Sequence, residues 1–288
     1  KLNDIDIDLT NYNFYLMPLA YVDAKTEVDA VITDEVKKYL DFVKNKVDTS
    51  DNNDEFTIAI SIDISFNKSN SFDGINFKYG ADGIEYDSRL TKDGVLVVLH
   101  DEEINGIKLN SIEYNQLKNI KFSNGQTIPT VEETIRSLNN KAILNLEVKE
   151  VEAAIPSYEI TKKLGALKRT LFSSFKVDAL RKIRKIDKEV KLGLLVQYDT
   201  LDNLPQLHKE LSLYSLNLWV DAVKENIQES SKMLRKWKDA GLKIYLWTLN
   251  NPQDLYDLEG FYDCVITDEV ELIVTERKRM KKKEQSSK

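Results

Sequence analysis

Apolar, β-rich segments alternate with segments of helical period from residue 56 onward, and this alternation constrains the fold more than any other feature. Strands that are separated by helices predict a parallel sheet, because each helix returns the chain to the start of the next strand. Such units over about 220 residues favour a closed (β/α)8 TIM barrel, an α/β fold, over an open sheet. The candidate strands lie at 56–64, 82–87, 95–101, 141–149, 168–175, 191–196, 213–220, 242–249 and 263–268.

The intervening segments and one turn refine this prediction. The second and third candidate strands are joined by Thr-Lys-Asp-Gly, in which Asp93-Gly94 predicts a turn. We therefore expect a local hairpin there rather than a full strand–helix unit.

Trp219 ends a candidate strand, and it either lines the mouth of the barrel or packs in the core. Apolar residues recur at helical spacing in 131–138, 177–186 and 227–237.

The hexapeptide Val-Ile-Thr-Asp-Glu-Val occurs twice, at 31–36 and at 265–270. We interpret residues 13–47 as a partial duplicate of the barrel's last strand–helix portion, with a chance similarity between two strand ends as the alternative. The duplicate either ends an upstream repeat or packs on the barrel. The predicted division is an N-terminal extension at 1–47, a polar linker at 48–55, the barrel at 56–275 and a basic C-terminal tail at 276–288.

Composition and charge narrow the class of protein. A net charge of −7 argues against a nucleic-acid partner. The single cysteine, Cys264, excludes an internal disulfide framework and a Cys-rich zinc site. The sequence contains no run of about 18 apolar residues, so we expect no transmembrane helix within it. It also has no recognisable signal peptide. Residues 275–288 carry seven Lys or Arg against two Glu, and they either form a solvated tail or contact an anionic lipid or polymer.

Three carboxylates are placed where the strands of a barrel converge. Glu85 and Asp87 are two residues apart on one strand, and Glu147 and Lys149 have the same spacing on another, so each pair points to one side. Carboxylates that converge on one mouth repel one another unless a cation lies between them, and oxygen ligands suit Mg²⁺ or Ca²⁺. Lys149 can hold a phosphate oxygen, and His100 can act as a general acid or base. The alternative for each is an ordinary salt-bridged or surface residue.

Several segments together resemble the glycerophosphodiester phosphodiesterase family. The longest is YGADGIEYDSRLTKDGVLVVLHD, which resembles the family's Gly-Ala-Asp, Glu-x-Asp, Thr-Lys-Asp-Gly and His-Asp elements. Shorter segments resemble its Pro-Thr-Leu-Glu-Glu, Glu-x-Lys, Ser-Phe, Trp-Thr-x-Asn and closing Val-Ile-Thr-Asp elements, in the family's order. The segments lie at 79–101, 128–133, 144–149, 173–175, 246–250 and 265–268, and the resemblance covers about residues 56–275.

The resemblance implies a TIM barrel that hydrolyses glycerophosphodiesters with a divalent cation, Mg²⁺ or Ca²⁺. It implies general acid–base chemistry at His100, phosphate contact at Lys149 and packing around the substrate's glycerol at Trp247. The metal ligands that it implies are Glu85, Asp87 and Glu147.

The chain departs from the family pattern at the first strand. The family has His-Arg-Gly there, followed by Pro-Glu-Asn-Thr, whereas this chain has no His before His100 and no Arg before Arg89. The first catalytic His, the phosphate-binding Arg and one metal carboxylate are therefore expected to be missing. A general acid–base residue contributes typically 10²–10⁴ in rate. His208 is the other histidine that could replace the missing imidazole, but it lies in a helix-like segment, away from any strand end. Asp63 and Asp73 are candidates to replace the lost carboxylate, and the sequence does not decide between them.

Three functional hypotheses follow from this. The first is a pseudoenzyme that serves as a binding or regulatory module for a partner protein or a glycerophosphate-type ligand, such as a glycerophosphodiester or a teichoic-acid-like polymer. In this hypothesis the affinity for Mg²⁺ or Ca²⁺ is weak or lost. The second is an active, divalent-cation-dependent phosphodiesterase of lipid metabolism with a rewired acid–base site. The third is a scaffold for protein partners only. We expect an extracytoplasmic, membrane-attached parent, because the chain starts at Lys1 rather than Met and some relatives carry a membrane domain; a cytoplasmic location is the alternative.

Overall fold

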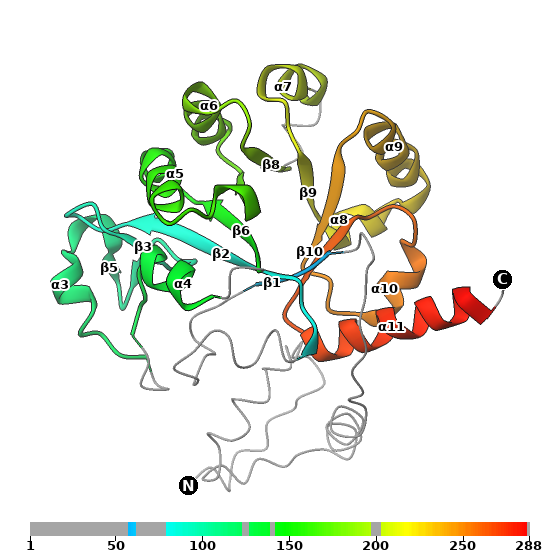
Figure 1. Ribbon diagram of the computed structural model, residues 1–288, viewed down its shortest axis with the longest axis horizontal. Coiled ribbons are helices and arrows are strands. Elements are labelled where there is room, and N and C mark those ends of the chain that lie inside the picture. The colour runs from blue at the N-terminus through cyan, green and yellow to red at the C-terminus, as the bar shows by residue number, and fades with distance from the viewer. Residues whose placement is uncertain (1–56, 62–78, 123–126, 139–141, 197–202, 287–288) are drawn as a thin grey trace, which may run out of the picture.

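The parallel strands form a closed ring, as their pairings show. The helices surround the strands on the outside (Figure 1). The computed structural model describes residues 57–61, 79–122, 127–138, 142–196 and 203–286. Each strand of the ring pairs in parallel with the next, and β1 pairs with both β11 and β2, which closes the barrel. The ring consists of β1 (Thr57–Ser61), β2 (Gly83–Leu90), β6 (Ile143–Val148), β7 (Thr170–Ser174), β8 (Lys191–Leu195), β9 (Ser215–Trp219), β10 (Lys243–Trp247) and β11 (Cys264–Thr267). The predicted TIM barrel is confirmed.

The helices follow the strands and cover the outside of the ring. Local sequence explains where they begin: Thr130 and Glu133 form a capping box at the start of α4, and Asn226 caps α9. The α-helices are α3 (Tyr114–Leu117), α4 (Val131–Ser137), α5 (Ala154–Lys163), α6 (Val177–Ile186), α7 (Leu204–Leu211), α8 (Val220–Glu225), α9 (Ile227–Asp239), α10 (Pro252–Asp257) and α11 (Val270–Ser286). Short 3-10 turns are η4 (Leu109–Ser111), η5 (Val151–Ala153) and η6 (Leu167–Arg169).

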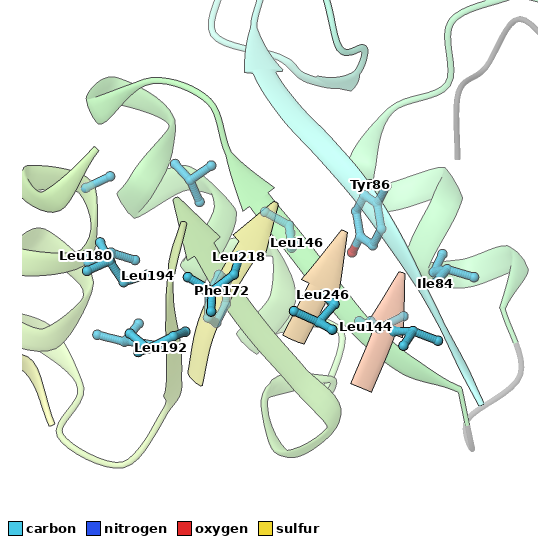
Figure 2. Close-up of a cluster of buried hydrophobic side chains, with 14 of the residues drawn as sticks. Ile84, Tyr86, Leu144, Leu146, Phe172, Leu180, Leu192, Leu194, Leu218 and Leu246 are labelled. Atoms are coloured by element: carbon cyan, nitrogen blue, oxygen red, sulfur yellow. The ribbon is translucent and has the colours of Figure 1, made fainter. Parts of the chain in front are cut away.

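Alternation along the strands divides the buried side chains into two clusters. The larger cluster fills the layer between the ring and the helices, and Figure 2 shows part of it. The smaller one, with Leu171, Tyr245, Cys264 and Ile266, lies on the opposite, inward face of the strands and includes the partly buried Trp247. Each strand thus has an apolar outer face, while its inward face can carry polar groups. The labelled members of the larger cluster are Ile84, Tyr86, Leu144, Leu146, Phe172, Leu180, Leu192, Leu194, Leu218 and Leu246.

The predicted hairpin is confirmed. β3 (Leu96–Val98) runs antiparallel to the end of β2, with Ser88 opposite Val98. Gly94 has a φ of +79°, a left-handed conformation that glycine adopts without strain, and it lies in the predicted turn. A second, two-stranded hairpin follows, formed by β4 (Glu103–Ile104) and β5 (Ile107–Lys108).

Some predicted features lie outside the described residues. These are the N-terminal extension, the linker, the first copy of the repeated hexapeptide, and Asp63 and Asp73. The second copy of the hexapeptide spans the end of β11 and the start of α11, and the basic residues beyond position 275 continue that helix to Ser286. In the part of the chain that the structure describes, no helix combines the length and the apolar character needed to cross a membrane.

Candidate active site

Strands β2 and β6 bring the three predicted carboxylates together. The strands pair in parallel with Asp87 beside Glu147. Glu85 lies two residues before Asp87 and so projects from the same face of β2. Each of the three side chains places a carboxylate oxygen within 4.8 Å of the other two, and all three residues are buried. The predicted convergence of Glu85, Asp87 and Glu147 is therefore observed, at the carboxyl ends of the strands, where barrel enzymes carry their active sites.

Lys149 lies against this carboxylate cluster. Its Nζ is 2.8 Å from Oε1 of Glu147 and 3.3 Å from Oδ1 of Asp87. The lysine side chain is 12% exposed, so both ion pairs are largely shielded from water. An ammonium group in this place offsets part of the repulsion among the carboxylates, which burial would otherwise make costly.

The site shifts the proton affinities of its members. Burial, and after it the charge of Asp87, raise the pKa of Glu147, and because Lys149 offsets only part of the increase, the pKa reaches about 7. Burial of the Lys149 ammonium favours its neutral form, but the charges of Asp87 and Glu147 outweigh this and raise the pKa of the lysine. Lys149 therefore stays charged at neutral pH, whereas Glu147 gains or loses its proton at a pH close to neutral.

The two histidines lie outside the carboxylate cluster. His100 follows β3, the hairpin strand, and its side chain is 66% exposed. Its Nδ1 is 2.9 Å from Oδ1 of Asp101, and its carbonyl oxygen accepts a 2.9 Å hydrogen bond from Nε of Arg89. His208 is on α7, whose buried residues face the outer core, so it does not approach the mouth.

Aromatic side chains occupy another part of the same mouth. Trp247 ends β10, and its ring meets that of Phe175 edge to face, with the ring centroids 5.9 Å apart. Trp219 ends β9, and its Cα is paired with that of Trp247. The position of Trp219 answers the question that the sequence left open: it lies at the mouth and is 46% exposed, so it is not a core residue.

A polar network at the end of β11 was not predicted as part of the site. Asn250 donates from Nδ2 to Asp268, 3.1 Å away, and its Oδ1 accepts from the hydroxyl of Thr267 and the backbone N–H of Asp268. Together with Arg89, these residues fix the loops around the mouth. The signal in the sequence is their position at or shortly after the carboxyl ends of strands, but it does not reveal which of them form hydrogen bonds with each other.

The residues present fit a divalent cation. The cluster offers only oxygen ligands, it carries the negative charge that an ion would balance, and its oxygens are already close together. Oxygen-only ligand sets favour Mg²⁺ or Ca²⁺ over zinc. The site can thus hold a metal ion, and the chemistry of the donors leaves the choice between these two ions open.

A closed TIM barrel with an acidic cluster at the carboxyl ends of its strands defines a class of barrels with a metal-binding site in the mouth. The sequence profile of the glycerophosphoryl diester phosphodiesterase family matches residues 75–272. This chain belongs to that family.

Individual relatives agree with this assignment. A glycerophosphodiester phosphodiesterase from Caldanaerobacter subterraneus subsp. tengcongensis is 30% identical over 216 residues, which are 68% of this chain and 85% of the relative. The crystal structure of a Thermotoga maritima glycerophosphodiester phosphodiesterase is 30% identical, with a TM-score of 0.66, over 77% of this chain and 99% of that one. An Oleispira antarctica phosphodiesterase, solved with its product sn-glycerol-3-phosphate, shares the fold at 21% identity and a TM-score of 0.63, over 77% of this chain and 96% of that one.

Proposed function

We propose that this chain is a glycerophosphodiester phosphodiesterase-like barrel that binds a divalent cation and a glycerophosphate-type ligand but has lost hydrolysis. The observation that carries the proposal concerns β1. The backbone of Ser61 pairs with that of Glu85 at the end of this strand, and the first-strand His-Arg of the family has no counterpart there. The chain has two histidines, and neither belongs to the carboxylate cluster.

The retained residues support binding. Glu85, Asp87 and Glu147 would hold the cation, which when bound supplies positive charge for phosphate oxygens. Lys149 reaches the same place and can turn its ammonium to an anionic oxygen. Trp247 gives the ligand an apolar surface beside it. The relative from Oleispira, solved with sn-glycerol-3-phosphate, suggests the class of ligand. A teichoic-acid-like polymer contains the same phosphodiester chemistry, and a partner protein could read the occupied state.

The second candidate function is an active phosphodiesterase with a rewired acid–base group. The His100–Asp101 pair favours it, because a carboxylate at Nδ1 orients an imidazole for proton transfer at its other nitrogen. Its exposed ring would have to reach the ligand from outside the carboxylate cluster.

The test is hydrolysis of glycerophosphocholine and glycerophosphoglycerol with Mg²⁺ or Ca²⁺, run beside His100→Ala. The proposal predicts no turnover by the wild type and calorimetric binding of Ca²⁺ that Asp87→Asn weakens at least tenfold. Turnover that disappears in His100→Ala would overturn the pseudoenzyme and establish the second candidate. Absence of both turnover and Ca²⁺ binding would leave a scaffold for protein partners.

A further inference from the structure

Trp219 is a large apolar side chain that the barrel leaves half-exposed. Along β9, Leu216 and Leu218 belong to the outer core, so the residues that alternate with them, beginning with Ser215 and Asn217, face inward. Trp219 continues that inward row at the carboxyl end of the strand. The pairing of its Cα with that of Trp247 places the two indoles on the same face of adjacent strands. The exposed ring of Trp219 therefore faces the mouth, not the outside of the barrel.

Three side chains form what we call the aromatic wall: Phe175, Trp219 and Trp247. Trp247 is packed edge to face against Phe175, which fixes its orientation, and both are partly buried. Trp219 extends the wall towards solvent and is 46% exposed. A single exposed indole would need no explanation, but Trp219 adjoins Trp247 and Phe175, and a contiguous apolar surface in the mouth of a barrel is where ligands commonly bind.

The wall lies at the carboxyl ends of β7, β9 and β10, with Phe175 directly after β7, and the carboxylate cluster lies on β2 and β6. The resemblance implies that Trp247 packs around the glycerol, so the second alcohol of a diester whose phosphate is held at the cluster would meet the solvent-facing part of the wall, at Trp219. Asp268 directly follows β11, the strand next to β10, and it accepts a hydrogen bond from Asn250. It does not belong to the carboxylate cluster. Its negative charge would remain beside the wall when a cation occupies the cluster.

An indole face next to a carboxylate attracts one kind of group more than others. The electron-rich face of tryptophan binds cations, and alkylated ammonium groups suit it best because they lose little hydration when they contact the ring. A neutral glycerol group gains no such attraction, and an anionic group is repelled by Asp268. We propose that Trp219 is a specificity-determining residue that contacts an alkylated ammonium group on the ligand's second alcohol. The phosphate half of this ligand rests on the proposed function.

The experiment compares two diesters that differ only in this group. Calorimetry with Ca²⁺ present measures glycerophosphocholine and glycerophosphoglycerol against wild type, Trp219→Leu and Trp219→Phe. Ile227→Ala is the matched control, because Ile227 is a 39% exposed apolar side chain on α9. We expect Trp219→Leu to weaken glycerophosphocholine about tenfold, a size typical of a cation–π contact, with little change for glycerophosphoglycerol. Trp219→Phe should retain most of the preference, and Ile227→Ala should retain all of it.

Two results would overturn the inference. One is an equal loss of both diesters in Trp219→Leu, which would make Trp219 a general packing residue. The other is no loss of either. Tetramethylammonium alone separates this inference from the proposed function. If the wild type binds neither diester, the proposed function fails, and tetramethylammonium binding that Trp219→Leu reduces would still support the role of Trp219. If the wild type does not bind tetramethylammonium either, the role of Trp219 is refuted.

Discussion

At the scale of single residues, the carboxylate cluster shows what spacing can and cannot reveal. The two-residue spacing of Glu85 and Asp87, and of Glu147 and Lys149, was enough to predict that these side chains share one mouth, because alternation is fixed by strand geometry. It could not reveal that Lys149 turns back onto Asp87 and Glu147, since a four-carbon side chain can reach many partners. The sequence also could not reveal that His100 is exposed, because its exposure depends on the direction in which the β2–β3 hairpin extends from the barrel.

The raised pKa of Glu147 makes stability depend on pH in a definite direction. The pKa is about 7 in the folded chain, against an ordinary value of 4.5. The folded state therefore binds this proton more tightly than the unfolded state does, and the stabilising contribution of the group falls as pH rises from about 4.5 to about 7. We expect Glu147→Gln to gain stability relative to wild type over this range, by about 1–3 kcal/mol at pH 7.5.

Urea denaturation of both proteins between pH 5 and 8, without metal, measures this difference. Glu132→Gln is the control, because Glu132 is a half-buried carboxylate whose pKa Arg136 and Lys163 lower. A difference between Glu147→Gln and wild type that stays constant with pH would show that Glu147 is already ionised in the folded chain.

At the scale of elements, the sequence predicted the strands, the main helices and the hairpin, because each has a local signal. Alternating apolar residues mark the strands, helical spacing marks α4, α6 and α9, and Asp93-Gly94 marks the turn. The contacts that join one element to the next carry no such signal. The clearest case is Arg184 on α6. Its guanidinium donates to the backbone oxygens of Asp187, Lys188, Val190, Leu211 and Ser212.

Arg184 thus joins the end of α6 to the segments that lead into β8 and out of α7. Replacing it with Met would remove the guanidinium donor from five carbonyl groups, two in buried and three in partly buried hydrogen bonds. We expect Arg184→Met to lower the free energy of unfolding by about 3 kcal/mol. Thermal and urea denaturation measure this loss. Arg181, on the same helix, pairs with the exposed Glu210 and Asp178, and Arg181→Met should cost less than about 1 kcal/mol. Equal losses in the two variants would refute the role given to Arg184.

At the scale of the whole molecule, the fold and the family could both be predicted from the sequence, because the order of motifs along the chain reports the order of strands around the ring. The activity could not. In the function that we propose, it depends on the first strand, where the chain has neither the His nor the Arg that the resemblance leads us to expect, and no pattern elsewhere in the chain shows whether another group replaces them.

A cation that binds only the folded barrel must stabilise the whole molecule. At a concentration one hundred times its dissociation constant, Ca²⁺ should add about 2.7 kcal/mol to the free energy of unfolding. The expected result is a rise in Tm with Ca²⁺ that EDTA reverses and that Asp87→Asn largely removes. The control variant, Asp178→Asn, changes an exposed carboxylate on α6 and should keep the full response. An equal rise in both variants would place the ion elsewhere.

The closure of the ring has a consequence for how the chain acquires its structure. Thr57 pairs with Cys264, and Ile60 pairs with Thr267, so the first and last strands of the barrel are neighbours although about two hundred residues separate them. Contacts this distant in sequence form slowly, because a long loop has to be closed before they contribute. During synthesis, β1 lacks its partner until β11 has left the ribosome. Until then both strands that flank the opening, β1 and β10, expose unpaired backbone groups, and the nascent chain is most prone to aggregation in that interval.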